Sequence, residues 1–279
     1  MKRVYIYIIG VMLTMGVQAQ TTYHKADSIK ICQLLQEASR HASPLWFARQ
    51  FLGVPYVAHT LEVNDKEQLV VNTRALDCTT LVETVTALTL CVERGQRSWD
   101  DYLNMLRSLR YRDGVLNGYP SRLHYFSDWI VNKEAMGYVT EVQEPNPPFT
   151  AEQVLDINFM SQHPQMYVSL TAHPEQTDMI RQQEEKLTGK TFRYIPKSAV
   201  LNTRLLRSVI KDGDIIAITC NKKGLDIAHL GFAMWKNDGL HFLHASYLRK
   251  KVVEEPQTLY RYLQKQPSHT GIRIVRLKR

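Results

Sequence analysis

The sequence predicts an α+β protein in which a cysteine-bearing helix packs on an antiparallel β-sheet, with additional helical segments. Helical apolar periodicity dominates the first half of the chain, whereas short apolar runs bounded by turn signals follow Pro196. The 279 residues are 44% hydrophobic and 22% charged, which excludes a disordered chain. Four cysteines are too few for a disulfide scaffold. No repeat or low-complexity linker divides the chain.

Residues 1–19 have the pattern of a signal peptide. Lys2 and Arg3 precede an uncharged, mostly apolar run over 4–17, and Val17-Gln18-Ala19 has the small-residue spacing of a cleavage site. The run is shorter than the ~20 residues that span a bilayer. We therefore expect an exported protein, periplasmic or secreted, with no stable membrane insertion after removal of the signal. Residues 20–279 are expected to form one domain.

The net charge of +8 falls to +6 without Lys2 and Arg3. The basic residues are scattered among acidic ones, so we expect no nucleic-acid partner. Their one local concentration is the tail 273–279, whose alternation is typical of one face of an edge strand.

Two helices are expected over about 22–52, because apolar faces recur there and Pro44 interrupts them. The proline-rich stretch 143–148 then ends one structural run. A polar, mostly helical pattern begins near Thr150 and continues to about Leu187. The segment at about 143–200 is therefore predicted to be a peripheral helical layer.

Short apolar runs after Pro196 predict the strands of the sheet. The first follows a Gly-Asp turn, and Lys-Asn-Asp-Gly separates the second from the third, which is a hairpin signal. The expected strands cover 214–220, 229–235, 240–245, 250–254 and 271–277.

The segment 76–95 carries the candidate nucleophile. Apolar residues at 81, 82, 85, 88 and 92 predict a helix with one buried face, Thr80 and Glu83 have capping-box spacing, and Gly95 suits its end. Cys78 then lies at the helix start, where unpaired amides and the helix dipole favour a thiolate and could hold an oxyanion. A buried, inert thiol is the alternative.

The other three cysteines, Cys32, Cys91 and Cys220, are predicted to be structural. Cys91 lies about 20 Å along the same helix from Cys78, so these two cannot form a disulfide. Disulfides among the three cannot be paired from sequence. No cluster has metal-ligand spacing, so we expect no metal site and no cofactor.

Two of the ten histidines are candidates for the base that a thiol nucleophile needs. If a loop of two or four residues joins their strands, register parity places His229 and His244 on one face and His241 on the other. One imidazole could then hold the other. An odd-length loop without a bulge would break this inference.

The combination resembles the NlpC-type papain-like cysteine peptidases, and within them the N-acetylmuramoyl-L-alanine amidase-like branch. The segments that carry the resemblance to the wider group are Leu52–Tyr56, Asp77-Cys78, Lys211–Ile215, His229-Leu230-Gly231 and His244-Ala245. Those that indicate the branch are Thr60–Glu62, Leu69–Glu83 and Ser121–Trp129. Thr79-Thr80 departs from the Ser-Gly usual in the wider group, so substrate contacts are expected to differ.

The resemblance implies a papain-like fold and thiol-dependent hydrolysis of an amide in peptidoglycan fragments. Cys78 would attack the carbonyl, His229 would act as base and then acid, and His244 would orient His229. Tyr56 and Asp77 would line the cleft.

Arg122 and His124 are candidates for binding a substrate carboxylate or sugar, or else belong to an ordinary helix start.

The expected bond joins N-acetylmuramic acid to L-alanine, with anhydro-muropeptides as one candidate substrate and with no cofactor. Three alternatives remain open on the sequence. They are an endopeptidase that cuts between D-glutamate and the diamino acid, a non-catalytic cell-wall-binding module, and a thiol acyltransferase. The oligomeric state is not predicted.

Overall fold

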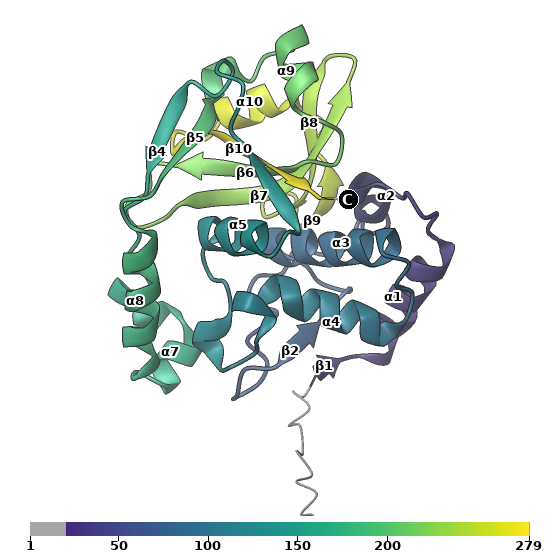
Figure 1. The fold of residues 1–279 in the computed structure, drawn as a ribbon, viewed down its shortest axis with the longest axis vertical. Helices are drawn as coiled ribbons and strands as arrows, with labels where there is room; N and C mark the ends of the chain where they lie inside the picture. The colour runs from purple at the N-terminus through teal and green to yellow at the C-terminus, as the bar shows by residue number, and fades with distance from the viewer. Residues whose placement is uncertain (1–20, 279) are drawn as a thin grey trace, which may run out of the picture.

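The computed structural model describes residues 21–278, and the predicted signal peptide lies outside the described residues. The chain forms a mixed α+β fold (Figure 1). Its helices are α1 Lys25–Glu37, α2 Pro44–Arg49, α3 Cys78–Glu93, α4 Trp99–Arg110, α5 Phe126–Ala135, α6 Phe159–Gln162, α7 Val168–Ala172, α8 Gln176–Leu187, α9 Arg204–Val209 and α10 Leu259–Gln264. Its strands are β1 Thr21–Tyr23, β2 Leu69–Val71, β3 Val139–Val142, β4 Ala151–Val154, β5 Thr191–Pro196, β6 Ile215–Cys220, β7 Ile227–Lys236, β8 Gly239–Ser246, β9 Lys251–Glu254 and β10 His269–Leu277. Within 21–278, no helix has the length and apolar character needed to cross a bilayer.

One antiparallel sheet organises the molecule. Its strands run in the order β4-β5-β10-β6-β7-β8-β9, and β3 pairs with the far end of β10. The five strands predicted after Pro196 are confirmed as β6 to β10. A separate parallel pair joins β1 to β2.

The prediction of an edge strand at 273–279 is wrong, because β10 pairs with β6 on one side and with β3 and β5 on the other. The basic side chains tolerate this central position because distant carboxylates neutralise them. Arg273 is fully buried and donates to Glu141 over 2.5 and 3.0 Å, and Arg276 pairs with Asp214 at 2.6 Å. A buried ion pair needs such complete partnering to offset desolvation.

The sheet separates two hydrophobic cores, as strand alternation requires. Leu230, Phe232 and Leu243 face the core shared with α1 to α5, whereas Ala233 and Phe242 face the core covered by α9 and α10. Figure 1 shows α3 and α5 beneath the sheet and α10 above it. Cys78, the first residue of the buried α3, therefore lies against the sheet.

The two N-terminal helices are confirmed, since Ser43 caps α2 and Pro44 occupies its first turn. Residues 21–23, however, form β1 and precede α1.

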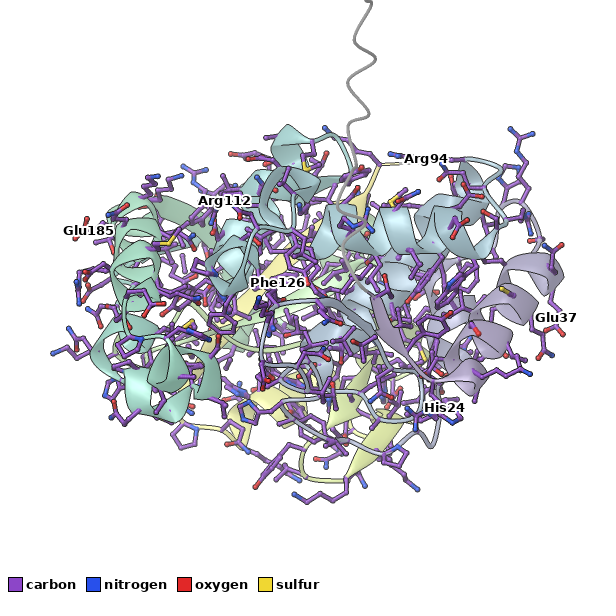
Figure 2. All side chains as sticks on the ribbon, turned by 90° about the horizontal axis from the view of Figure 1, so that it is seen from below. His24, Glu37, Arg94, Arg112, Phe126 and Glu185 are labelled. Carbon is purple, nitrogen blue, oxygen red and sulfur yellow. The ribbon has the colours of Figure 1, made fainter. Side chains whose placement is uncertain are left out.

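The segment 143–200 is only partly helical, which corrects the prediction of a helix from Thr150. Residues 151–154 pair with 191–194 as β4 and β5, since their alternating half-buried and exposed positions suit a strand at the margin of the sheet. The helices α6 to α8 lie between these strands and build a small third core with Tyr119 and Tyr125. In Figure 2, Glu185 of α8 and Glu37 of α1 mark opposite ends of the molecule, so the segment is peripheral.

Candidate active site

Cys78 is the first residue of α3, and Asp77 caps the helix. The Asp77 carboxylate accepts from the Thr80 backbone N–H at 2.8 Å, and the Thr80 hydroxyl accepts from the Asp77 N–H at 2.9 Å. The predicted Thr80–Glu83 capping box is therefore wrong by one turn: Glu83 is buried and pairs with Arg110. Asp77 lies next to Cys78, but its carboxylate caps α3.

The two candidate histidines meet. His229 Nε2 and His244 Nδ1 lie 2.6 Å apart, as the same-face prediction required. The β7–β8 loop has two residues, because Lys236 pairs with Gly239, so the parity argument holds. His241 faces away and contacts Asp238 and the Glu255 carbonyl.

Gly231 permits this approach. A Cβ at this position would lie 2.6 Å from the Phe242 ring and 2.9 Å from the His244 Cβ, distances that real contacts do not reach. The β7–β8 ladder ends at Phe232 and Leu243, so the two strands separate just beyond Gly231. The glycine of the His-Leu-Gly segment thus lets the imidazoles meet where the strands part.

Cys78 and His229 line one cavity of about 180 Å³, here called the Cys78 cavity. The Cys78 sulfur accepts a hydrogen bond from the Leu230 backbone, the residue after His229. The half-buried thiol therefore lies beside the strand that carries the imidazole. The remaining wall comes from the first turn of α3, from α5 and the loop before it, from α6, from the residue before α7, and from the start of β7 and the residues just before it. It includes Thr79, Leu123, His124, Tyr125, Phe126, Trp129, Met160, Tyr167, Leu225, Asp226, Ile227 and Ala228.

Burial holds the site in a neutral resting state. Burial and the Asp77 carboxylate raise the pKa of the Cys78 thiol to about 12, while hydrogen bonds from Leu230 and Thr79 act in the opposite direction. Burial and the neighbouring His244 lower the pKa of His229 well below its ordinary value. The thiolate expected from the helix start alone is therefore wrong for the resting site, because desolvation outweighs the helix amides.

Tyr56 lies close to Cys78. A bridge to Leu76 fixes its backbone beside α3, and its ring meets Tyr247 edge-on at 5.6 Å. Burial, with Cys78 and Asp77 nearby, raises the pKa of the half-buried Tyr56 phenol, so its hydroxyl remains a donor. Tyr56 and Tyr247 thus form an aromatic edge beside the cysteine.

His124 contributes a neutral imidazole to the Cys78 cavity. Burial and nearby Arg122 lower the pKa of His124 to about 3. Its Nε2 lies 3.0 Å from the Tyr119 carbonyl oxygen, which can only accept, so the proton belongs on Nε2. Nδ1 is then an acceptor.

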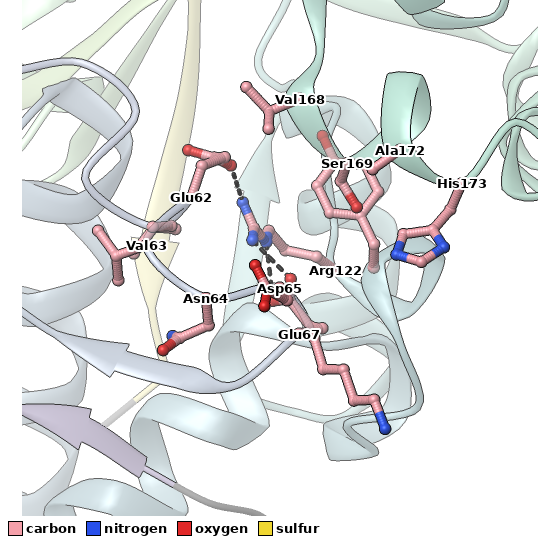
Figure 3. Close-up of a pocket in the computed structure, with 13 residues that line it drawn as sticks. Glu62, Val63, Asn64, Asp65, Glu67, Arg122, Val168, Ser169, Ala172 and His173 are labelled. Atoms are coloured by element: carbon pink, nitrogen blue, oxygen red, sulfur yellow. Dashed lines mark hydrogen bonds and ion pairs between the residues drawn. The ribbon is translucent and has the colours of Figure 1, made fainter.

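Arg122 is held by two carboxylates, as Figure 3 shows. Its guanidinium donates to Glu62 at 2.5 Å and to both oxygens of Glu67 at 3.0 and 2.6 Å. These residues line a second cavity of about 390 Å³ between the 61–67 loop and α7, here called the Arg122 cavity. Arg122 consequently offers no uncompensated charge to a ligand.

Sequence reasoning missed three charged residues around the site. Asp226 lines the Cys78 cavity and accepts from the Ser127 N–H at 2.6 Å, which caps α5. Glu255 lies 3.6 Å from His244 and pairs with Arg249. No periodicity or spacing marks these residues, because each reaches the site through a loop or strand end.

All four cysteines belong to the described residues and are free, so none of the disulfides left open by the sequence is present. No group of three or more His, Cys, Asp or Glu residues in 21–278 has an arrangement that could hold a metal ion.

The fold and the comparisons define an amidase-like class of α+β protein. More particularly, the chain belongs to the N-acetylmuramoyl-L-alanine amidase-like (AmiA-like) family, whose model matches residues 46–272. It is similar to a crystal structure of an N-acetylmuramoyl-L-alanine amidase from Bacteroides uniformis, with 40% identity and a TM-score of 0.80 over 87% of this chain and 100% of that one. The family implies a hydrolase with a cell-wall substrate.

Two further solved structures are similar. A Bacteroides fragilis protein, provisionally described as a xylanase, is 41% identical, with a TM-score of 0.76 over 82% of this chain and 98% of that one. A Legionella pneumophila protein at 23% identity shares the fold, with a TM-score of 0.69 over 91% and 95% of the two chains. No curated protein matches the chain significantly.

Proposed function

We propose that the protein is a cysteine-dependent amidase of the papain-like NlpC type, cutting the bond between N-acetylmuramic acid and L-alanine in peptidoglycan fragments. The observation that carries this proposal is Cys78 at the start of α3, in one cavity with His229, whose far nitrogen contacts His244. A nucleophile, a base and a group that orients the base are the parts that thiol acyl transfer needs.

The tautomers define the roles. His229 uses Nε2 toward His244, which leaves Nδ1 to take the Cys78 proton. The sulfur then attacks the substrate carbonyl, and the imidazolium returns its proton to the leaving amine of L-alanine. Water hydrolyses the thioester with His229 again as base. The Cys78 and Thr79 amides, in the first turn of α3, are the candidates for holding the oxyanion.

The Cys78 cavity supports binding of a donor-rich group. His124 Nδ1 and the Asp226 carboxylate are acceptors, and the cavity wall includes no Lys or Arg among the described residues. Hydroxyl and amide N–H groups of the muramoyl-peptide fit such a wall, whereas a carboxylate does not. We propose His124 as a direct substrate contact, Tyr56 as part of the cleft edge, and Asp77 and Arg122 as groups that position α3 and the 61–67 loop.

The endopeptidase alternative uses the same residues, and only the products distinguish it. Glycosidase chemistry of the xylanase kind has less support, because it requires two carboxyl groups facing each other. Among the described residues lining the Cys78 cavity, Asp226 is the only carboxylate.

The test is hydrolysis of a defined anhydro-muropeptide and its non-anhydro counterpart. Release of a peptide that begins with L-alanine supports the proposal, and release of a dipeptide supports the endopeptidase. Cys78→Ala and His229→Ala should abolish turnover while substrate binding persists. Cys32→Ala, which alters another half-buried free thiol, is the matched control. Full turnover by Cys78→Ala would exclude the mechanism.

We also propose that the protein acts outside the cytoplasm, where its substrate lies, after removal of residues 1–19. N-terminal sequencing of the protein recovered from its native compartment tests this, and an intact Met1 in the periplasmic or secreted form would contradict it.

A further inference from the structure

A buried carboxylate lies behind the histidine pair. Glu255 follows β9 and is 3% exposed, and its Oε2 lies 3.6 Å from His244 Nε2. That separation is an electrostatic contact, longer than a hydrogen bond. His244 is itself fully buried, and its Nε2 has no hydrogen-bond partner among the described residues. Glu255 therefore provides the nearest counter-group for this buried nitrogen.

Arg249 keeps Glu255 in place and ionised. Its Nε and Nη2 donate to the two carboxylate oxygens at 3.0 Å each. Burial raises the pKa of Glu255, but the hydrogen bonds from Arg249 and the contact with His244 outweigh it and lower the pKa to about 2. The carboxylate thus remains an acceptor at every pH at which an imidazole can be neutral.

The Glu255 carboxylate determines which nitrogen of His244 carries the proton. A carboxylate beside Nε2 of His244 favours the proton on that nitrogen, which leaves Nδ1 of His244 as an acceptor. His229 must then donate from Nε2 across the 2.6 Å contact, and its own Nδ1 is left without a proton. This is the only neutral arrangement in which His229 can take a proton from Cys78.

We propose that Glu255 is a positioning residue that acts through His244: it fixes the tautomers of both imidazoles and stabilises the imidazolium formed when His229 accepts the Cys78 proton. The inference rests on the proposed cysteine chemistry. It adds Glu255 as a fourth group behind Cys78, His229 and His244. Arg249 belongs to it as the anchor of Glu255. The negative charge acts across one imidazole, so no proton leaves His244.

Several other titratable or packed groups lie near Cys78, His229 and His244 and also influence the pH dependence of Cys78 reactivity. Cys78 has Asp77 and Tyr56 nearby, and His269, when it is protonated, also disfavours protonation of His229. The Tyr262 ring packs edge-on against His244 at 5.6 Å. Each stays unchanged in the comparison below.

The test is the rate of Cys78 alkylation by iodoacetamide between about pH 6 and pH 10, resolved from Cys32 by peptide mass. Glu255→Gln should lower the rate near neutral pH about tenfold, since base assistance is typically worth 10²–10⁴-fold and Glu255 supplies part of it. The rates should converge with wild type as pH rises and the thiol ionises unaided. Glu255→Asp should recover part of the loss.

Glu254→Gln is the matched control. It makes the same change on the adjacent residue, whose carboxylate pairs with Arg49 and Lys236 instead. Its alkylation profile should equal that of wild type.

A double-mutant cycle separates positioning from folding. In the His244→Ala background, Glu255→Gln should have no further effect. An unchanged profile for Glu255→Gln, or an equal loss in both backgrounds, would overturn the proposal. Alkylation requires no substrate, so the outcome stays interpretable even if the enzyme cuts no muropeptide.

Discussion

His229 and His244 touch at 2.6 Å at the place where β7 and β8 separate, and Gly231 leaves the space for that contact. The contact orients an imidazole that lines the same cavity as Cys78, so activity should depend on a backbone position that itself carries no chemistry.

Gly231→Ala tests this dependence. The added methyl would meet the Phe242 ring and His244, so His244 must shift. We expect kcat to fall tenfold or more, with a loss of about 1–3 kcal/mol in the free energy of unfolding from overpacking. Amidase kinetics and urea unfolding measure the two effects. Retention of wild-type kcat would show that the imidazole contact does not matter for turnover.

The thiol of Cys78 should titrate above the ~8.5 of an ordinary cysteine, because burial opposes its ionisation. Alkylation near neutral pH should then be slower than for a free thiol and should rise through the alkaline range. Asp77→Asn removes the neighbouring charge but keeps a capping oxygen, so it should lower the thiol pKa while the helix stays intact. A rate that is already constant below pH 7 would instead indicate a thiolate–imidazolium pair at rest.

Acid should unfold the protein through its neutral buried histidines. Burial lowers the pKa of His124 to about 3 and of His269 to about 4, below the unfolded value near 6.5. Below about pH 6.5 the unfolded state therefore binds more protons, and stability is lost as pH falls. For His124 the loss at about pH 4.5 is on the order of 2–3 kcal/mol. Urea unfolding of wild type and His124→Gln across this range measures it, and parallel curves would contradict the assignment.

Arg122→Ala should be strongly destabilising. The change leaves Glu62 and Glu67 without their shared partner, at a cost of about 3–5 kcal/mol. Arg181→Ala is the matched control, because its pair with Asp178 is exposed and should contribute no more than about 1 kcal/mol. Thermal unfolding of both variants gives the comparison. Equal small shifts would mean that Arg122 is free to serve a ligand.

The elements that the sequence predicted correctly are those whose structure depends on nearby residues. The helix at 78–93 and the strands after Pro196 follow from apolar periodicity, and hairpin parity placed His229 and His244 on one face. The strands β4 and β5 were not predicted, because their polar residues are also typical of a surface helix. Only the pairing with a partner strand distinguishes the two. The position of β10 depends on Glu141 and Asp214, which lie far away in sequence and neutralise its arginines.

The same distinction applies to the candidate active site. Its cysteine and histidines were predicted from the sequence, but their pKa values depend on burial and on residues distant in sequence. The Cys78 pKa rises because α3 is pressed against the sheet, which the helix start alone does not reveal. Glu62 and Glu67 hold Arg122 from 60 and 55 residues away. Glu255 reaches His244 only because β9 pairs with β8 at the edge of the sheet, with Val253 opposite His244.

The place of β10 also determines when the fold can close. β3, β5 and β6 all pair with it, and all three are synthesised before it. Until residues 269–277 leave the ribosome, the middle of the sheet lacks its strand and the cores on either side stay open. The chain must therefore complete its fold after translation of this region, and trimming it back should leave a polypeptide that cannot assemble.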